Sequence, residues 1–361
     1  MIKVKNMTVY IFVLGFCLLS FTCNSPTGPG ASDQPGRRDY VWTVDTIYSV
    51  DNLFSTIYGA TPNNVWLGGH GGPPNERLWH YDGSNWKQVP SPEGCNANSI
   101  FGFSANDIWL GSYAGKIFHY DGTNWNQNFV CGPPNSDPII TEIYGTSPTD
   151  IYAIGSLAFY NSDTTGRGFI LHYFGGGWRE EYVAAIQGLN FGDFMLQEGS
   201  KVFFVGWDTQ DTEVIFQYSN SRLLEIIKSS ADIGLIHMAL LGGKVYFLLG
   251  KDLSRYVDGN FEKIVTLDIN ISNIGYQLYG RNLKDIFLIV GDGIEHYNGD
   301  NIQYLYRLPT TSPFIYARSL IFENDVFFVL NYTDPSNFSK TLILHGKLTN
   351  YEMHGLKEKT S

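Results

Sequence analysis

Apolar and polar positions alternate along most of this chain in short runs, and each run ends at Gly, Asn, Asp or Pro. The stretch from Ser99 is representative, because the segments SIFG, DIWLG, KIFHY and NWNQ follow one another with little more than turn residues between them. A period of two residues in runs this short is typical of half-buried β-strands. We therefore expect four short strands here, named A, B, C and D in chain order.

The same four-strand unit recurs along the sequence. The clearest copies start at Thr56, Ser99, Glu142 and Gln277, and three less regular copies contain FFVGW, VYFLLG and VFFVLNY as strand B. One strand C position is held by Tyr81, Tyr120, Tyr173, Tyr218, Tyr256, Tyr297 and Gly346. Five residues later a large apolar side chain stands in every copy: Trp86, Trp125, Trp178, Leu223, Phe261, Ile302 and Tyr351. The agreement in all seven copies supports one common frame.

Seven units of four strands predict an all-β fold, a seven-bladed β-propeller of four-stranded antiparallel blades over residues 40–361. The stretch 222–241 could also form an amphipathic helix, but the repeat frame passes through it and favours strand, loop and strand. Ring closure has two candidates, because both Trp42 and the segment 350–356 fit a strand D in the last blade.

Two turns of the unit have their own signals. The A–B turn ends at Asn64, Asp107 or Asp150 in the clearest copies, which suits an Asx turn. The C–D turn carries Asp-Gly at 82–83 and 121–122, and Gly supplies the positive φ angle that a tight hairpin needs.

With its DGxxW turn, the unit resembles the repeats of Asp-box and kelch-type propellers. It departs from the Asp-box pattern, which has a residue between Asp and Gly. The resemblance covers residues 40–361 and implies the propeller architecture, but carries little information about activity.

The first 22 residues read as a signal peptide, with Lys3 and Lys5 before a short apolar run. The region resembles a bacterial lipoprotein leader, which implies a lipidated Cys23 followed by a flexible linker over residues 23–39. Ser20 and Thr22 depart from the usual pattern, so an ordinary secretory leader is the alternative. The expected location is the bacterial cell envelope, on the periplasmic or outer face of the outer membrane, or outside the cell if Cys23 is not lipidated.

Charge and cysteine content add two expectations. The formal net charge of −11 becomes −13 once Lys3 and Lys5 leave with the leader, so the body should repel nucleic acid. Cys95 and Cys131 fall in D–A connections one blade apart, and an exported protein can oxidise such a pair. We predict a disulfide between them, with two buried free thiols as the alternative.

Motifs for chemistry are sparse. Five histidines occupy one strand C position, and symmetry keeps equivalent positions of a ring apart, so we predict no metal site: His80, His119, His172, His296 and His345. The sequence offers no catalytic residue by motif, and we expect no cofactor.

The B–C connections vary in length and composition, whereas the A–B and C–D turns are uniform. Variable loops on a rigid scaffold are where binding usually resides. We therefore expect the B–C and D–A face to bind an envelope protein or a glycan, with these candidates: Tyr113, Tyr160, Arg167, Trp207, Asp208 and Tyr332. Membrane contact is expected through the lipid anchor only, and the chain is expected to be a monomer. The competing functions are a glycan-active enzyme, sialidase-like or lyase-like, at the channel mouth, and a structural surface protein without a specific ligand.

Overall fold

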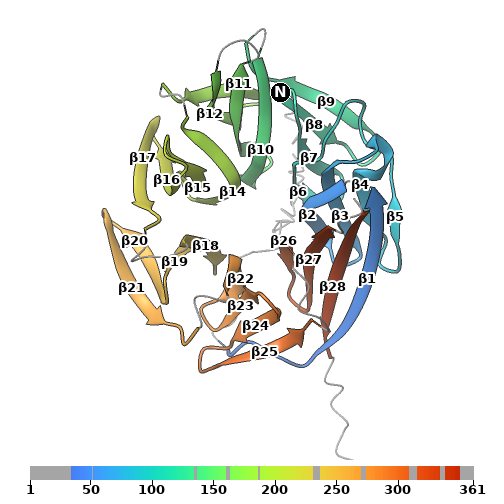
Figure 1. Cartoon of the computed structure of the whole chain (residues 1–361), viewed down its shortest axis with the longest axis vertical. Helices are drawn as coiled ribbons and strands as arrows, with labels where there is room; N and C mark the ends of the chain where they lie inside the picture. The colour runs from blue at the N-terminus through green and yellow to red at the C-terminus, as the bar shows by residue number, and fades with distance from the viewer. Residues whose placement is uncertain are drawn as a thin grey trace, which may run out of the picture.

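The computed structural model describes residues 34–50, 52–133, 136–159, 163–185, 188–230, 236–269, 274–308, 315–333 and 338–349. Its strands form seven antiparallel sheets of four strands each, which Figure 1 shows as the blades of one ring. The prediction of an all-β propeller with seven blades is confirmed.

Blades 1 to 6 each consist of four consecutive strands, from strand A at the centre of the ring to strand D outside. Blade 1 holds β2 (Asn52–Thr61), β3 (Asn64–Gly71), β4 (Leu78–Tyr81) and β5 (Trp86–Gln88), with the 3-10 helix η1 (Pro74–Glu76) before β4. Blade 2 holds β6 (Ser99–Ser104), β7 (Asp107–Gly111), β8 (Lys116–Tyr120) and β9 (Trp125–Val130). Blade 3 holds β10 (Ser136–Ser147), β11 (Asp150–Phe159), β12 (Asp163–Phe174) and β13 (Gly177–Val183).

Blade 4 holds β14 (Asn190–Glu198), β15 (Lys201–Trp207), β16 (Glu213–Ser219) and β17 (Arg222–Lys228). Blade 5 holds β18 (Ile236–Leu241), β19 (Lys244–Leu249), β20 (Asp252–Val257) and β21 (Asn260–Thr266). Blade 6 holds β22 (Ile274–Asn282), β23 (Asp285–Val290), β24 (Gly293–Tyr297) and β25 (Ile302–Arg307). The ambiguous stretch 222–241 contributes β17 and β18, so its two predicted strands are confirmed.

Blade 7 closes the ring with strands from both ends of the chain. Its inner three strands are β26 (Ile315–Ile321), β27 (Asp325–Thr333) and β28 (Phe338–Leu348), and β1 (Tyr40–Val50) is the outer strand. Trp42 lies opposite Gly346, as Trp86 lies opposite Tyr81 in blade 1. The N-terminal candidate for closure is therefore correct (Figure 1). The segment 350–356 and Tyr351 lie outside the described residues.

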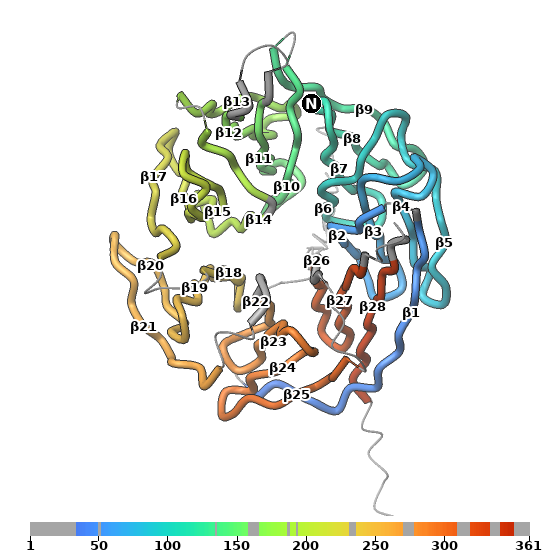
Figure 2. Tube along the Cα trace, in the orientation of Figure 1, coloured from blue at the N-terminus to red at the C-terminus, as the bar shows by residue number. Residues whose placement is uncertain are grey.

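The apolar core lies between neighbouring blades, and the repeated aromatic residues build it. Trp66 of blade 1 contacts Tyr120 and Trp125 of blade 2, with ring centroids 5.3 and 5.8 Å apart. Trp109 of blade 2 meets the equivalent Tyr and Trp of blade 3 at 5.0 and 5.6 Å. The strand C tyrosine and the strand D tryptophan thus hold the strand B aromatic of the preceding blade. This explains why aromatic side chains recur at these positions. Figure 2 traces the chain through all seven blades.

Candidate functional site

The face formed by the A–B and C–D turns is held by a polar contact that five blades repeat. In each, Nε2 of the strand C histidine lies 2.7–3.3 Å from the side-chain oxygen of the first strand B residue: His80 and Asn64, His119 and Asp107, His172 and Asp150, His296 and Asp285, His345 and Asp325. The aromatic ring two residues further along strand B packs on the imidazole at 4.0–4.8 Å. Each histidine therefore supports its own blade. The described residues contain no group of three His, Cys, Asp or Glu side chains that could hold a metal ion.

Asp82 and Asp121 each form an Asx turn in a C–D hairpin. Asp121 Oδ1 accepts two hydrogen bonds from backbone N–H groups of its own hairpin, at 2.8 and 2.9 Å, and Asp82 does the same. In the A–B turn, by contrast, Asp107 Oδ1 pairs with the His119 ring and accepts from the indole of Trp109. The expected A–B Asx turn is replaced because the carboxylate faces strand C, where these side-chain donors reach it.

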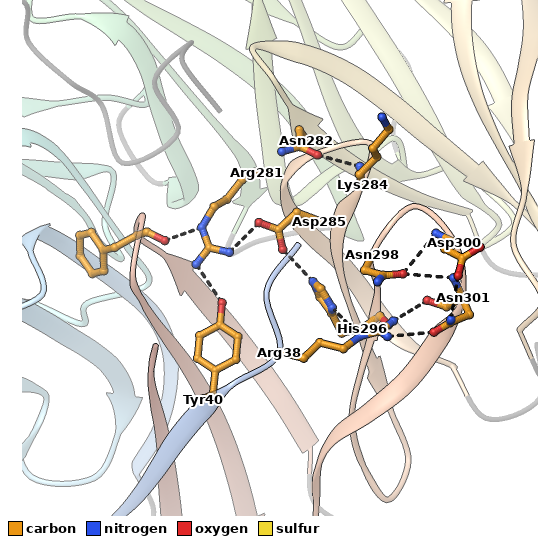
Figure 3. Close-up of polar contacts among 11 residues, drawn as sticks. Arg38, Tyr40, Arg281, Asn282, Lys284, Asp285, His296, Asn298, Asp300 and Asn301 are labelled. Atoms are coloured by element: carbon orange, nitrogen blue, oxygen red, sulfur yellow. Dashed lines mark hydrogen bonds and ion pairs between the residues drawn. The ribbon is translucent and has the colours of Figure 1, made fainter. Parts of the chain in front are cut away.

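Residues 36–39 extend the closure from blade 7 onto the same face of blade 6. The Gly36 N–H donates to Lys284 O at 2.7 Å. Arg38 donates to His296 O and to Asn301 Oδ1, both at 2.8 Å, and its Nε lies 3.3 Å from His296 Nδ1 (Figure 3). We call residues 36–39 the strap. The sequence predicts a flexible linker over residues 23–39, whereas its last four residues are packed against a blade.

The strap selects one protonation state of His296. Because the Arg38 guanidinium only donates, His296 Nδ1 must accept, and Nε2–H is left to donate to Asp285. Burial lowers the pKa of His296, and Arg38 acts in the same direction. Gly36 is required for this contact, since a Cβ there would lie 2.6 Å from Asp285 Oδ1.

A cavity of about 160 Å³ lies on the ring axis, lined by side chains from the inner strands of all seven blades. Most of the lining is apolar. Glu142 of β10 and Arg318 of β26 form an ion pair inside it, each side chain being 12% exposed. Arg318 also lies 5.3 Å from the ring centroid of Phe194, and Ser99 Oγ lies 3.3 Å from the Glu142 carboxylate. The pair joins blade 3 to blade 7 across the channel. Burial raises the pKa of nearby Tyr279 to about 12.

The opposite face is called the loop face. Three of the candidate binding residues lie there between blades 3 and 4: Arg167, Trp207 and Asp208. The backbone next to Arg167 hydrogen-bonds to residues 188–189, and a Cβ on Gly166 would meet Asn190. Asn190 in turn pairs with Trp207 across β14 and β15, and Asp208 follows. Arg167 and Trp207 are half-buried, and Arg167 Nε is buried without a hydrogen-bond partner. We call Arg167, Asn190 and Trp207 the blade 3–4 cluster.

Asp208 has a role within its own loop. Its Oδ1 accepts from the N–H groups of Gln210 and Thr212 at 2.9 and 3.0 Å, and Lys228 pairs with the carboxylate at 3.2 Å. These backbone hydrogen bonds hold the pKa of Asp208 below its usual value. Asp208 thus shapes the B–C connection of blade 4. It lines a surface cavity of about 250 Å³ with Leu189, Thr209, Gln210, Glu225 and Lys228.

The other candidates on this face are dispersed. Tyr113 of blade 2 forms a backbone bridge with Ile139 at the start of blade 3. Tyr332 belongs to β27 of blade 7, opposite Lys340. Tyr160 lies outside the described residues, as does Cys23.

Cys95 and Cys131 are free thiols in the structure, and the disulfide between them stays a prediction. Cys95 packs into the core between blades 1 and 2, whereas Cys131 packs against the core between blades 2 and 3. Burial raises the pKa of both thiols to about 12, which leaves little of the thiolate that disulfide formation requires.

Sequence reasoning missed Glu142, Arg318, Asn190 and the strap. Glu142 and Arg318 are 176 residues apart, and no spacing rule connects them. Asn190 follows a D–A connection without a turn motif of its own. The one available signal was the pair of arginines at 37 and 38, which is unusual at the end of a flexible linker.

No known protein-family profile matches the chain, and no curated protein matches its sequence. Within the part that the structure describes, no helix is long and apolar enough to span a bilayer. Several solved structures share the fold. YCF48 bound to a D1 peptide has a TM-score of 0.58 at 13% identity, over 88% of this chain and 100% of that one. YCF48 from Cyanidioschyzon merolae has a TM-score of 0.53 at 11% identity, over 85% and 98%.

Raptor from Chaetomium thermophilum aligns over 87% of this chain but only 29% of its own, with a TM-score of 0.53 at 13% identity. At identities this low, the similarities establish one property of the chain, its propeller fold.

Proposed function

We propose that the chain is a binding scaffold that recognises a protein partner through the loop face at blades 3 and 4. The observation that carries the proposal is the difference between the two faces. On the A–B and C–D side, side chains are committed to histidine pairs, Asx turns and the strap. On the loop face, the blade 3–4 cluster presents the partly exposed residues Trp207 and Arg167, and the buried Nε of Arg167 has no hydrogen-bond partner.

The chemistry of the cluster favours a protein partner. Trp and Arg are the residue types most enriched among interface residues that dominate binding energy. Asn190 adds both a donor and an acceptor for backbone groups. A solved structure of YCF48, which shares the fold, has a D1 peptide bound, and this supports a peptide segment as the recognised unit.

The central cavity supports an enzyme less well. Glycoside hydrolysis usually needs two carboxylates roughly 5–10 Å apart. Among the described residues lining the cavity, Glu142 is the one carboxylate, and Arg318 already pairs with it. The raised pKa of Tyr279 also disfavours a tyrosinate nucleophile near neutral pH.

We further propose that the chain is exported and lipid-anchored at Cys23. The strap enters on the A–B and C–D side of blade 6, so a tether over residues 24–33 would place the membrane on that side. A Gly/Ser-type linker of ten residues spans about 18 Å on average. The loop face would then point away from the bilayer and be accessible to a partner.

Binding can be tested with arrays of overlapping envelope-protein peptides and of glycans, probed with residues 34–361 so that the strap is retained. Trp207→Ala and Arg167→Ala should each weaken capture of the same peptides by tenfold or more. Phe174→Ala is the matched control, because Phe174 is an aromatic residue 58% exposed on the opposite face of blade 3. Equal losses of capture in all three variants would contradict the face assignment. Capture of glycans alone would show that the ligand is a glycan and not a protein.

The anchor is tested separately by fractionating cells that express the full chain. Cys23→Ser should move the protein out of the membrane fraction, whereas Cys17→Ser, in the same leader, should leave it there. Retention of the Cys23→Ser variant in the membrane would rule out this anchor.

A further inference from the structure

The outer edge of blade 7 differs from the outer edges of the other blades. Six large apolar side chains are exposed among the described residues, and three of them, Val41, Val44 and Tyr48, are on β1. The strand has 11 residues, whereas the other strands D have between 3 and 7. An exposed, apolar outer strand offers a row of backbone donors and acceptors to another strand.

The other outer strands are protected against such pairing. In blades 2 to 6, strands C and D are joined with a register shift that bends the outer strand. In blade 1, β5 has only three residues. By contrast, β1 pairs with β28 through 11 consecutive residue pairs without a shift. Soluble proteins usually avoid long, regular strands at a free sheet edge. Because β1 is such a strand, we expect its free edge to pair with another strand.

We propose that β1 is a dimer interface, where it pairs antiparallel with β1 of a second copy of this chain. A two-fold axis at Val44 places Val44 opposite its own copy, Tyr40 opposite Tyr48, and Val41 opposite Ile47. Each of the two exposed valines and the exposed tyrosine then lies beside an apolar or aromatic residue of the second copy. Such cross-strand pairs stabilise antiparallel sheets. An isologous two-fold interface is the commonest way for identical chains to associate.

The charges at this edge agree with self-pairing. Asp45 is the one charged residue of β1, and the axis at Val44 places it opposite Thr43 of the second copy. An axis shifted by one residue would oppose the two Asp45 carboxylates, which selects the register at Val44. The neighbouring strand β28 carries Lys340 and Lys347. The negative net charge of the whole chain, −11, is therefore not concentrated at this edge and does not oppose pairing of two copies there. A dimer replaces the monomer that the sequence alone suggests.

Cysteine cross-linking of the full chain in its membrane tests the register. Under mild oxidation, Val44→Cys should link two copies at least tenfold faster than Tyr48→Cys, with the unsubstituted chain as the baseline. Tyr48 is the matched control because it is 69% exposed against 44% for Val44, so random collisions would favour Tyr48→Cys. Linking at both positions would indicate a parallel register and overturn the proposal, as would linking at neither.

A second measurement distinguishes other occupants of the edge. Val44→Lys should convert a detergent-solubilised dimer to monomer in analytical ultracentrifugation. Val130→Lys, at a similarly exposed position on β9, should not. A monomeric unsubstituted chain would refute the dimer. Cross-linking of Val44→Cys only after removal of residues 350–361 would also refute it, by showing that the chain's own end covers β1.

Discussion

Removal of one partner from the cross-channel ion pair should cost more than removal of both. The Glu142 and Arg318 side chains are each 12% exposed, so both charges have lost most of their hydration. Breaking a buried pair typically costs about 3–5 kcal/mol, because the remaining charge is left unpaired. In Arg318→Met, Glu142 keeps the Ser99 hydroxyl, at 3.3 Å, as a hydrogen-bond donor. The cavity of about 160 Å³ can admit water to the Glu142 carboxylate once Arg318 is removed, so we expect the lower value, about 3 kcal/mol.

The double variant Glu142→Leu/Arg318→Met leaves no buried charge and fills an apolar cavity with apolar groups. Its stability should lie within about 1.5 kcal/mol of the unsubstituted chain, since such replacements are often neutral. Urea unfolding followed by tryptophan fluorescence measures all four proteins of the cycle. The reasoning is refuted if the two single losses simply add in the double variant, because the side chains would then not interact across the channel.

The remaining predictions concern closure and turns. Arg38→Ala removes the hydrogen bonds to His296 and Asn301, so exchange of the Gly36 amide should accelerate by about tenfold or more; unchanged exchange would show that the strap does not depend on Arg38. The folded-state pKa of His296 is depressed, so the stabilisation that the neutral histidine contributes is complete above the unfolded pKa of about 6.5 and is lost as the pH falls below that value. Protection of the Gly36 amide should therefore decrease in acid, and a flat protection profile from pH 7 to pH 5 would contradict the neutral histidine. Trp42→Ala should destabilise the ring by about 2–3 kcal/mol in urea unfolding, whereas Val41→Ala, 60% exposed, should cost under about 0.5 kcal/mol; equal effects would argue against closure through β1. Gly122→Ala should cost more than Gly176→Ala, since both have positive φ but only at Gly122 would the Cβ meet a neighbour, Asn106 Oδ1 at 2.6 Å; similar melting temperatures would refute the steric argument.

The periodic part of the structure could be predicted from sequence because each blade repeats the same local constraints. Trp42 fits strand D since its distance from the next unit matches that of Trp86, and the structure pairs both tryptophans in the same way. The histidines and the strand B aspartates were both evident as repeats. Their mutual contact was not, because it depends on the register between strands B and C, which the intervening loop sets.

The contacts that are unique in the ring could not be predicted. The distance between Glu142 and Arg318 is fixed by the diameter of the closed ring, a property of all seven blades together. The strap follows a Gly- and Pro-containing stretch typical of a linker, and only the packed structure shows that Gly36 is needed for its contact with Asp285 and His296. On the loop face, the cluster depends on how the D–A connection after blade 3 meets β12, which follows no turn motif.

Hydrogen–deuterium exchange of residues 34–361, with and without the tightest peptide from the array, tests most directly which side of the propeller recognises a partner. Our account predicts new protection at residues 166–168 and 205–213, with the C–D hairpins at 82–85, 121–124 and 298–301 unchanged. Protection confined to those hairpins would contradict it.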